Sequence, residues 1–309
     1  MKTIISNAWI CSIKGNSVQP VFGNLILDNG KIVEIEKTKF EEFQKSGNDK
    51  EKNVYDAAGR VITIPNVNFH EHIYSRLSKG LQINGDTDSF YNILNNLWWK
   101  LDRSLDRQMV EASAQMASAE SIKNGVTYLF DHHSSPDFAE GSLERIAGVL
   151  KKNKLRGVLC FETTDRNGTA LSQKGMDENI NFNRHGVDEN IKNMFGFHAS
   201  FTVDDSTFKK AADFVNGNDI GIHIHLCEAE ADREISKSRF GKLPLQRLID
   251  NNLLNSKSIL SHSIHLTAKE YKKIESSGSA IAINPESNLN NAVGINNFKL
   301  IPDSVPLLC

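Results

Sequence analysis

The stretch from Ile220 to Glu228, I-G-I-H-I-H-L-C-E, decides the fold class and points to the chemistry. It reads as a short apolar strand with histidines at alternate positions, His223 and His225, so both imidazoles lie on one face. Burying an imidazole without a partner costs free energy, so a metal ion or a dense hydrogen-bond network is expected there. Glu228 follows just beyond the strand, where a carboxylate serves as a general base and proton carrier or favours the start of a helix.

Apolar segments of similar length recur along most of the chain, and amphipathic helical stretches such as 107–124 and 243–252 alternate with them. Repeated strand–helix units imply parallel strands joined by right-handed crossovers. Eight strands favour an α/β fold, a (β/α)8 TIM-like barrel whose eighth strand is incomplete; a doubly wound sheet is the alternative on pattern alone. The expected strands are Val61–Asn68, Val126–Asp131, Gly157–Glu162, Met194–His198, Ile220–Leu226, Ser258–Ser261, Ala280–Ile283 and Val305–Leu308.

The beginning of the chain departs from this alternation. Short strands are expected at 3–13, 23–28 and 31–36. Asn29-Gly30 between the last two is a strong hairpin-turn signal. The polar segment 37–53 reads as an exposed connection. We therefore divide the chain into residues 1–60 and 61–309.

Histidines gather where the expected strands end. His70 and His72 end the first strand as H-x-H and point to one side, so both can face one cation; two surface histidines in a loop are the alternative. In a barrel the carboxyl ends of the strands meet on one face, where catalytic groups sit. The remaining strand-end histidines are His132 and His133 on the second strand, His198 on the fourth and His262 on the sixth.

The composition excludes several classes of protein. The 309 residues are 39% hydrophobic and 24% charged, as in a globular protein, and the net charge of -2 gives no attraction to nucleic acid or anionic lipid. No apolar run approaches the ~20 residues that span a bilayer. The four scattered cysteines indicate reduced thiols. We expect a cytoplasmic protein that acts on a small molecule, with neither nucleic acid nor membrane as partner, and leave a homo-oligomer open.

Four ordered motifs resemble those of the amidohydrolase superfamily, in its deaminase and chlorohydrolase branch. Residues 64–72 (IPNVNFHEH) resemble the P-G-x-x-x-x-H-x-H signature, with Asn66 in place of glycine, and 223–232 (HIHLCEAEAD) resemble the H-L-x-E motif. Residues 260–266 (LSHSIHL) and 283–289 (INPESNL) resemble the sixth- and seventh-strand motifs. The strings FDHHSSP and GFHASFTV are most similar to the aminohydrolase group called SsnA.

This resemblance implies a (β/α)8 barrel beside a small β-sandwich built from both chain ends, so residues 1–60 are expected to be a partial β-sandwich domain and 61–309 the hydrolase barrel. It implies one divalent metal ion, zinc or iron(II), since the fourth strand lacks the lysine that bridges two metals in some members. His223 and His265 are left for strand packing and hydrogen bonding. The implied site residues are His70, His72 and His225 as metal ligands, Glu228 and His262 as catalytic residues, and His198 and His133 as substrate-binding residues.

The implied reaction is hydrolytic deamination of a heterocyclic or amidine-like C–N bond by a metal-activated water. Three alternatives stand beside it: hydrolysis of another leaving group (chloride or a cyclic amide), a truncated non-catalytic metal-binding protein, and a barrel without metal. The superfamily's eighth strand ends in an aspartate, and the sequence stops at Cys309 inside the expected strand. We therefore expect the chain as printed to be truncated, a poor folder and a poor enzyme.

Overall fold

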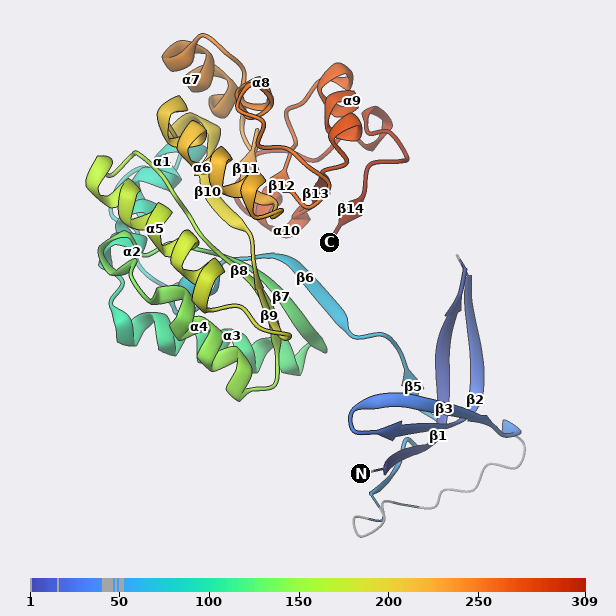
Figure 1. The fold of residues 1–309 in the computed structure, drawn as a ribbon. Helices are drawn as coiled ribbons and strands as arrows, with labels where there is room; N and C mark the ends of the chain where they lie inside the picture. The colour runs from blue at the N-terminus through green and yellow to red at the C-terminus, as the bar shows by residue number, and fades with distance from the viewer. Residues whose placement is uncertain (1, 16, 41–46, 48, 50–52) are drawn as a thin grey trace. The chain divides into compact units, whose positions relative to one another are not determined.

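The computed structural model describes residues 2–15, 17–40, 47, 49 and 53–309. The chain divides by its contacts into two compact units, Met1–Pro65 and Asn66–Cys309, and each is described by itself. In Figure 1 the smaller unit is mostly blue, and the larger unit runs from light blue through green and yellow to red. Among the described residues we find no helix with the length and hydropathy of a membrane span.

The smaller unit is a five-stranded sheet in the order β3-β2-β1-β4, with β5 also beside β1. Its strands are β1 (Lys2–Lys14), β2 (Ser17–Asp28), β3 (Lys31–Lys37), β4 (Val54–Asp56) and β5 (Val61–Ile62). The hairpin predicted at Asn29-Gly30 is confirmed: it joins β2 to β3, and both turn residues have left-handed backbone, with φ of 49° and 77°. β2 begins earlier than expected, since residues 17–22 also pair with β1. Most of the predicted connection 37–53 lies outside the described residues.

The strand predicted at Val61–Asn68 is wrong in its bounds. Val61–Ile62 is β5 and pairs with β1 in the N-terminal sheet, whereas Asn66–Glu71 is β6, the first strand of the larger unit. Pro65 lies between them, and proline has no backbone N–H to donate to a sheet. The H-x-H histidines therefore stand at the end of a strand that belongs wholly to the larger unit.

The strands of the larger unit pair in parallel, as predicted. They are β6 (Asn66–Glu71), β7 (Val126–His133), β8 (Arg156–Phe161), β9 (Ile191–Asn193), β10 (Phe195–Ala199), β11 (Ile222–Leu226), β12 (Ile259–His262), β13 (Ala280–Ala282) and β14 (Leu307–Leu308). Two sheets result, in the orders β6-β7-β8-β9 and β10-β11-β12-β13-β14, and a parallel bridge between Thr163 and Phe197 joins them. Over the described strands β14 does not pair with β6, so a closed barrel is not shown.

Helices alternate with these strands and lie outside them in Figure 1. The α-helices are α1 (Phe90–Ile93), α2 (Trp99–Ser104), α3 (Arg107–Lys123), α4 (Ser142–Lys152), α5 (Thr169–His185), α6 (Asp205–Gly217), α7 (Glu230–Phe240), α8 (Pro244–Asp250), α9 (Ala268–Ser277) and α10 (Pro285–Asn290). The other helical turns are η2 (Ile73–Ser78), the π-helix η3 (Leu94–Trp98), η4 (Pro136–Phe138), η5 (Ser200–Thr202) and η6 (Phe298–Leu300). The helices predicted at 107–124 and 243–252 correspond to α3 and α8.

The two faces of a strand have different surroundings, as β11 shows. Ile222 and Ile224 pack with Phe208 of α6 in a hydrophobic core between strands and helices. His223 and His225 alternate with them and therefore point to the opposite, inner face. The ring of His225 contacts histidines of β6, a strand that is not its neighbour in either sheet. The strands therefore curl around a shared interior.

One buried amide ties the two sheets together. Asn179 of α5 accepts hydrogen bonds at Oδ1 from the backbone N–H groups of Phe161 (2.9 Å) and Gly196 (3.3 Å). Its Nδ2 donates to the carbonyl of Phe161 at 2.8 Å and to Thr163 Oγ1 at 3.1 Å. The side chain thus satisfies buried groups of β8 and β10 at the point where their own pairing is interrupted.

Replacing Asn179 by alanine should orphan the backbone N–H groups of Phe161 and Gly196, whereas the carbonyl of Phe161 keeps the N–H of Thr163 as a donor at 2.9 Å. Each buried unsatisfied polar group costs roughly 1–3 kcal/mol, so we expect the free energy of unfolding to fall by about 3 kcal/mol in chemical denaturation. Asn218→Ala is the control, because the exposed Asn218 amide donates to the carbonyl of Phe214 in its own helix; this variant should lose less than about 1 kcal/mol. Equal losses in the two variants would argue against a special role for Asn179.

Candidate metal centre and active-site pocket

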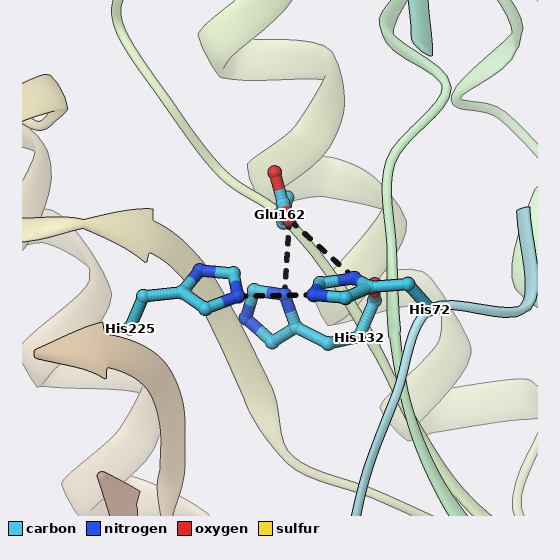
Figure 2. A group of neighbouring side chains, drawn as sticks. All are labelled: His72, His132, Glu162 and His225. Carbon is cyan, nitrogen blue, oxygen red and sulfur yellow. Dashed lines mark hydrogen bonds and ion pairs between the residues drawn. The ribbon is translucent and has the colours of Figure 1, made fainter. Parts of the chain in front are cut away.

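Three imidazoles from two separate strands meet inside the larger unit. His70 and His72 come from the end of β6 and His225 from β11, and their ring centroids lie 4.7, 4.9 and 5.1 Å apart. His72 Nε2 and His225 Nε2 are 3.0 Å apart (Figure 2). Two nitrogen ligands of a tetrahedral zinc ion lie about 3.3 Å apart, given Zn–N bonds of about 2.0–2.1 Å. The structure thus brings one nitrogen pair, of His72 and His225, to close to metal-ligand spacing. His70 belongs to a second group, with His225 and His262, whose possible ligand atoms lie within 4.8 Å of one another.

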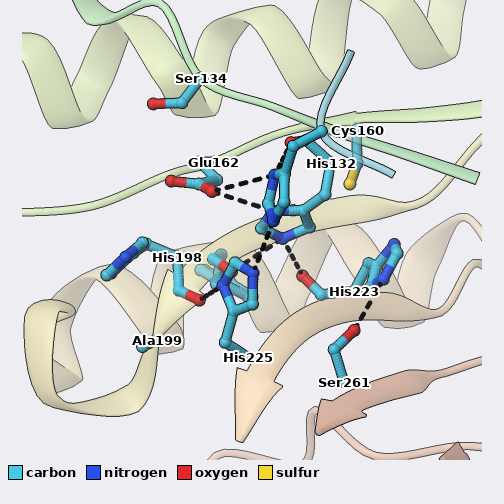
Figure 3. Close-up of polar contacts among 12 residues, drawn as sticks. His132, Ser134, Cys160, Glu162, His198, Ala199, His223, His225 and Ser261 are labelled. Carbon is cyan, nitrogen blue, oxygen red and sulfur yellow. Dashed lines mark hydrogen bonds and ion pairs between the residues drawn. The ribbon is translucent and has the colours of Figure 1, made fainter. Parts of the chain in front are cut away.

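Backbone carbonyls fix the orientation of two of these rings. His72 Nδ1 donates to the carbonyl oxygen of His132 at 2.8 Å. His225 Nδ1 donates to the carbonyl oxygen of His198 at 2.7 Å (Figure 3). A carbonyl oxygen only accepts, so each Nδ1 carries the proton and each Nε2 keeps its lone pair. Two lone pairs then face each other, an arrangement that a shared cation stabilises.

The third imidazole also offers an unused nitrogen. His70 Nδ1 lies 3.0 Å from both Ser261 Oγ and His223 Nε2, so that side of the ring is hydrogen-bonded. His70 Nε2 is buried and has no hydrogen-bond partner. Because a proton on this nitrogen would be a buried unsatisfied donor, the lone pair belongs there. The donor set therefore fits a divalent metal, held by the Nε2 atoms of His70, His72 and His225.

The imidazoles are already in the form that binds metal. Burial lowers the pKa of His72 to about 4, although the nearby Glu162 carboxylate acts to raise it. Burial also places the pKa values of His70 and His225 well below the ordinary value, and neighbouring histidines add to this effect. Neutral imidazole is the metal-binding form, so no proton has to leave these rings near neutral pH.

A fourth histidine lies beside the three but has no free nitrogen. His132 Nδ1 is 3.1 Å from Glu162 Oε1. Its Nε2 is 3.0 and 3.1 Å from the carbonyl oxygens of His223 and Phe197 (Figure 3). All three partners are acceptors, so both ring nitrogens of His132 are engaged in polar contacts. By spacing alone His132 and Glu162 could join a metal group with the two facing histidines (Figure 2), but unlike His70 Nε2, neither ring nitrogen of His132 is without a partner.

The two predicted catalytic residues lie side by side next to this centre. Glu228 follows β11 by two residues, and its Oε2 is 3.4 Å from His262 Nε2 at the end of β12. His262 Nδ1 donates to Asn288 Oδ1 at 2.7 Å, so the Nε2 lone pair faces Glu228. Burial raises the pKa of Glu228 to about 8, against the lowering effect of a hydrogen bond from Asn291. Glu228 can therefore hold a proton near neutral pH.

Left-handed backbone marks the ends of the same two strands. Cys227 has φ of 48°, His262 of 66° and Ser263 of 52°. Such conformations cost non-glycine residues of order 1–3 kcal/mol each and persist where the surroundings hold them. Here the Ser263 N–H donates to the carbonyl of Leu226 at 2.9 Å, which ties the two strand ends together. Strain is thus concentrated where Glu228 and His262 leave their strands.

The two histidines predicted on the substrate side take different places. His198 lines a cavity beside the metal centre, with its ring 5.6 Å from that of His225 and its Nδ1 2.8 Å from Thr202 Oγ1. His133 is buried, and its Nε2 lies 2.8 Å from Ser135 Oγ in the turn after β7. Among the described residues that line the cavity His133 is absent, so its substrate role stays a prediction.

Polar and aromatic side chains together line the cavity, as is usual for small-molecule sites. Its wall includes residues that the sequence analysis did not single out. Glu162 could have been found as a carboxylate at the end of an apolar strand, but several helical segments and a loop supply the others, and no strand-end signal marks those. The additional polar and aromatic residues include Glu162, Asp102, Arg166, Trp98, Trp99, Phe90 and Phe201.

Fold and site together define a parallel α/β protein with a buried histidine metal centre. The chain belongs to the amidohydrolase family, whose model matches residues 62–305. It is 26% identical over 298 residues to a 5-methylthioadenosine/S-adenosylhomocysteine deaminase of Thermococcus onnurineus, covering 96% of this chain and 66% of the relative. It is 28% identical over 276 residues to a 5'-deoxyadenosine deaminase of Methanobrevibacter smithii, covering 88% of this chain and 60% of the relative. The chain therefore spans less than two thirds of the length of these relatives.

Solved structures share the fold. A guanine deaminase from C. acetobutylicum matches 99% of this chain and 73% of its own, with a TM-score of 0.83 and 15% identity. An adenosine deaminase from Xanthomonas campestris with bound zinc matches 99% of this chain and 67% of its own, with a TM-score of 0.79 and 22% identity. At these identities the likeness concerns the arrangement of strands and helices alone.

Replacing His225 by alanine should weaken zinc binding at least 10–100-fold, the loss typical of residues that merely orient a ligand. Competition with a chromophoric chelator measures the affinity. His185→Ala is the control, since His185 is exposed at the end of α5 and should leave the affinity unchanged. If His225→Ala binds zinc as tightly as the unmodified protein, His225 is not a ligand.

Proposed function

We propose that the protein is a mononuclear metal-dependent hydrolase that deaminates a small aminated heterocycle or amidine-like compound. Water adds to the carbon that carries the amino group, the C–N bond breaks, and ammonia leaves. The facing Nε2 atoms of His72 and His225, which line one cavity with Glu228, and the partnerless Nε2 of His70, whose ring contacts both, carry the proposal. The deaminase names of the relatives support a C–N bond as the one that breaks.

We assign the centre one divalent ion, zinc or iron(II), because three neutral imidazoles suit both. When bound there, such an ion supplies a Lewis acid and lowers the pKa of a water molecule. β10, which corresponds to the fourth strand expected at Met194–His198, supports a single ion, since it carries no lysine that could bridge two. Lys192 of the short β9 is exposed. The bound zinc of the Xanthomonas campestris neighbour favours zinc by analogy.

Glu228 is assigned the proton transfers. Deamination requires a group that takes a proton from water and then gives one to the departing nitrogen. The raised pKa of Glu228 suits both directions near neutral pH, because neither protonation state is strongly favoured. His262 Nε2, at 3.4 Å, lies close enough to polarise the substrate or to steer the attacking water.

We assign substrate binding to His198, which lines the pocket, and to His133 as a second residue. We further propose that residues 61–309, apart from β5, belong to a (β/α)8 barrel, and that residues 1–60 together with β5 belong to a β-sandwich. The parallel pairing within both sheets and the contact of His70 in β6 with His225 in β11 across the interior support the barrel.

Glu228→Gln keeps the shape of the side chain and removes its basicity. Turnover of aminated heterocycles, followed as ammonia release, should fall by about 10²–10⁴-fold while zinc content stays unchanged. Glu230→Gln is the matched control, because Glu230 lies two residues further on and its side chain is 69% exposed. Loss of zinc from Glu228→Gln would instead make Glu228 a metal ligand, and near-normal turnover would leave it a purely structural role.

A further inference from the structure

The wall of the cavity away from the three metal-site imidazoles contains buried polar atoms without partners. They are Trp99 Nε1, Asp102 Oδ1, and the Nε and Nη1 atoms of Arg166. All three residues line the cavity that also holds His225 and Glu228. The side chains of Arg166 and Asp102 are only 7% and 2% exposed. Arg166 Nη1 has an ion-pair neighbour at 3.6 Å, Glu162 Oε2, but makes no hydrogen bond. Trp99 Nε1, Arg166 Nε and Asp102 Oδ1 thus stand unused in a place where leaving them unsatisfied costs free energy.

Neighbouring contacts hold these atoms in place. Asp102 Oδ2 receives hydrogen bonds from Arg166 Nη2 and, at 2.9 Å, from Ser134 Oγ, which leaves Oδ1 unused. The guanidinium of Arg166 lies 5.3 Å from the ring of Trp99, a cation–π distance. Trp99 and Asp102 are three residues apart on α2, so they share one face of the helix. Phe201 adds a further apolar wall, and together these side chains suit a flat ring.

The buried charges of this wall already face one another. The Arg166 guanidinium pairs with Asp102, and its Nη1 lies 3.6 Å from Oε2 of the second buried carboxylate, Glu162. An anionic substituent would therefore add an unpaired buried charge, whereas a neutral polar edge would not.

We propose that Arg166, Trp99 and Asp102 form the specificity end of the pocket and take the lactam edge, O=C–N–H, of an amino-oxo heterocycle. The carbonyl oxygen accepts from the Arg166 and Trp99 donors, and the adjacent ring N–H donates to Asp102 Oδ1. This rests on the proposed function, because it sets the amino-bearing carbon towards Glu228 and the histidine centre. Substrates with an amino group but no ring carbonyl leave the same atoms unsatisfied.

The test compares bases that differ in the lactam edge alone. Guanine and 2-aminopurine share the amino group, as do cytosine and 4-aminopyrimidine, and in each pair only the first carries a ring carbonyl. Dissociation constants are measured on the zinc-loaded protein in the Glu228→Gln background, so that bound base is not consumed. We expect the oxo member of at least one pair to bind about 10–100-fold more tightly, as hydrogen bonds to a charged group allow.

Two variants remove the donors separately. Arg166→Lys keeps the charge beside Asp102 but loses the fork, and Trp99→Phe keeps the ring but loses its N–H. Both should bring the binding ratio within each pair towards one. Arg103→Met is the control, since Arg103 of the same helix is 52% exposed and pairs with Asp137, and it should keep the ratio. Trp99→Phe alone decides the matter if Arg166→Lys fails to fold.

Several results would overturn the inference: equal binding within both pairs, no binding of either oxo base, or ratios that the two variants do not change. Tighter binding of adenosine than of guanine would also overturn it and would assign the three residues to ribose hydroxyls. Failure of the proposed function looks different. In that case the oxo base binds selectively and the variants act as expected, but the unmodified protein releases no ammonia from any of the bases.

Discussion

The site depends on hydrogen bonds that cross from one strand to the next. His72 beyond β6 donates to a carbonyl of β7, and His225 of β11 donates to a carbonyl of β10. In both cases the acceptor lies on the neighbouring strand, so the register of the parallel pairs sets the direction of the imidazole. A slip of one residue would turn each side chain to the other face of its strand. The backbone ladder, rather than any side chain, therefore aims the lone pairs at a common point.

Two buried ion pairs stand behind this centre, Arg166 with Asp102 and His132 with Glu162. Taking such charges out of water costs several kcal/mol per ion, and well-packed apolar residues often replace buried pairs without loss of stability. Their presence in a cavity wall is thus better explained by a role in ligand binding than by a contribution to the stability of the fold. The Arg166–Asp102 pair leaves a polar surface of zero net charge, which favours a neutral ligand.

The clustering of His70, His72 and His225 could be predicted from the sequence, because period-two spacing and the strand-end rule for parallel folds apply to them directly. The sequence did not show which of His132 and His133 faces the interior. In a parallel sheet both faces of a strand are covered, so apolar residues flank both histidines and give no direction. In the structure Phe130 packs against a cluster of residues from several strands, whereas Leu129 packs in the cluster that also contains residues of the helices α3 and α4. Side chains alternate along a strand, so His132 lies on the same inner face as Phe130. The bounds of the first strand also escaped prediction, since the partner of β5 is the distant β1.

The metal end of the pocket carries a sequence signal because its histidines alternate along strands. The specificity end carries none because its residues do not lie on strands. Arg166 comes from a loop and Asp102 from a helix, and nothing in their spacing along the chain relates them. Yet Glu162 joins the two ends: its Oε1 pairs with His132, whose carbonyl orients His72, and its Oε2 lies 3.6 Å from Arg166 Nη1. The separation between the metal ligands and the Arg166 guanidinium is thus set by a continuous series of buried contacts. Such a pocket discriminates between ligands by their size and shape, because a ring must reach both the metal site and the Arg166 guanidinium across one fixed distance.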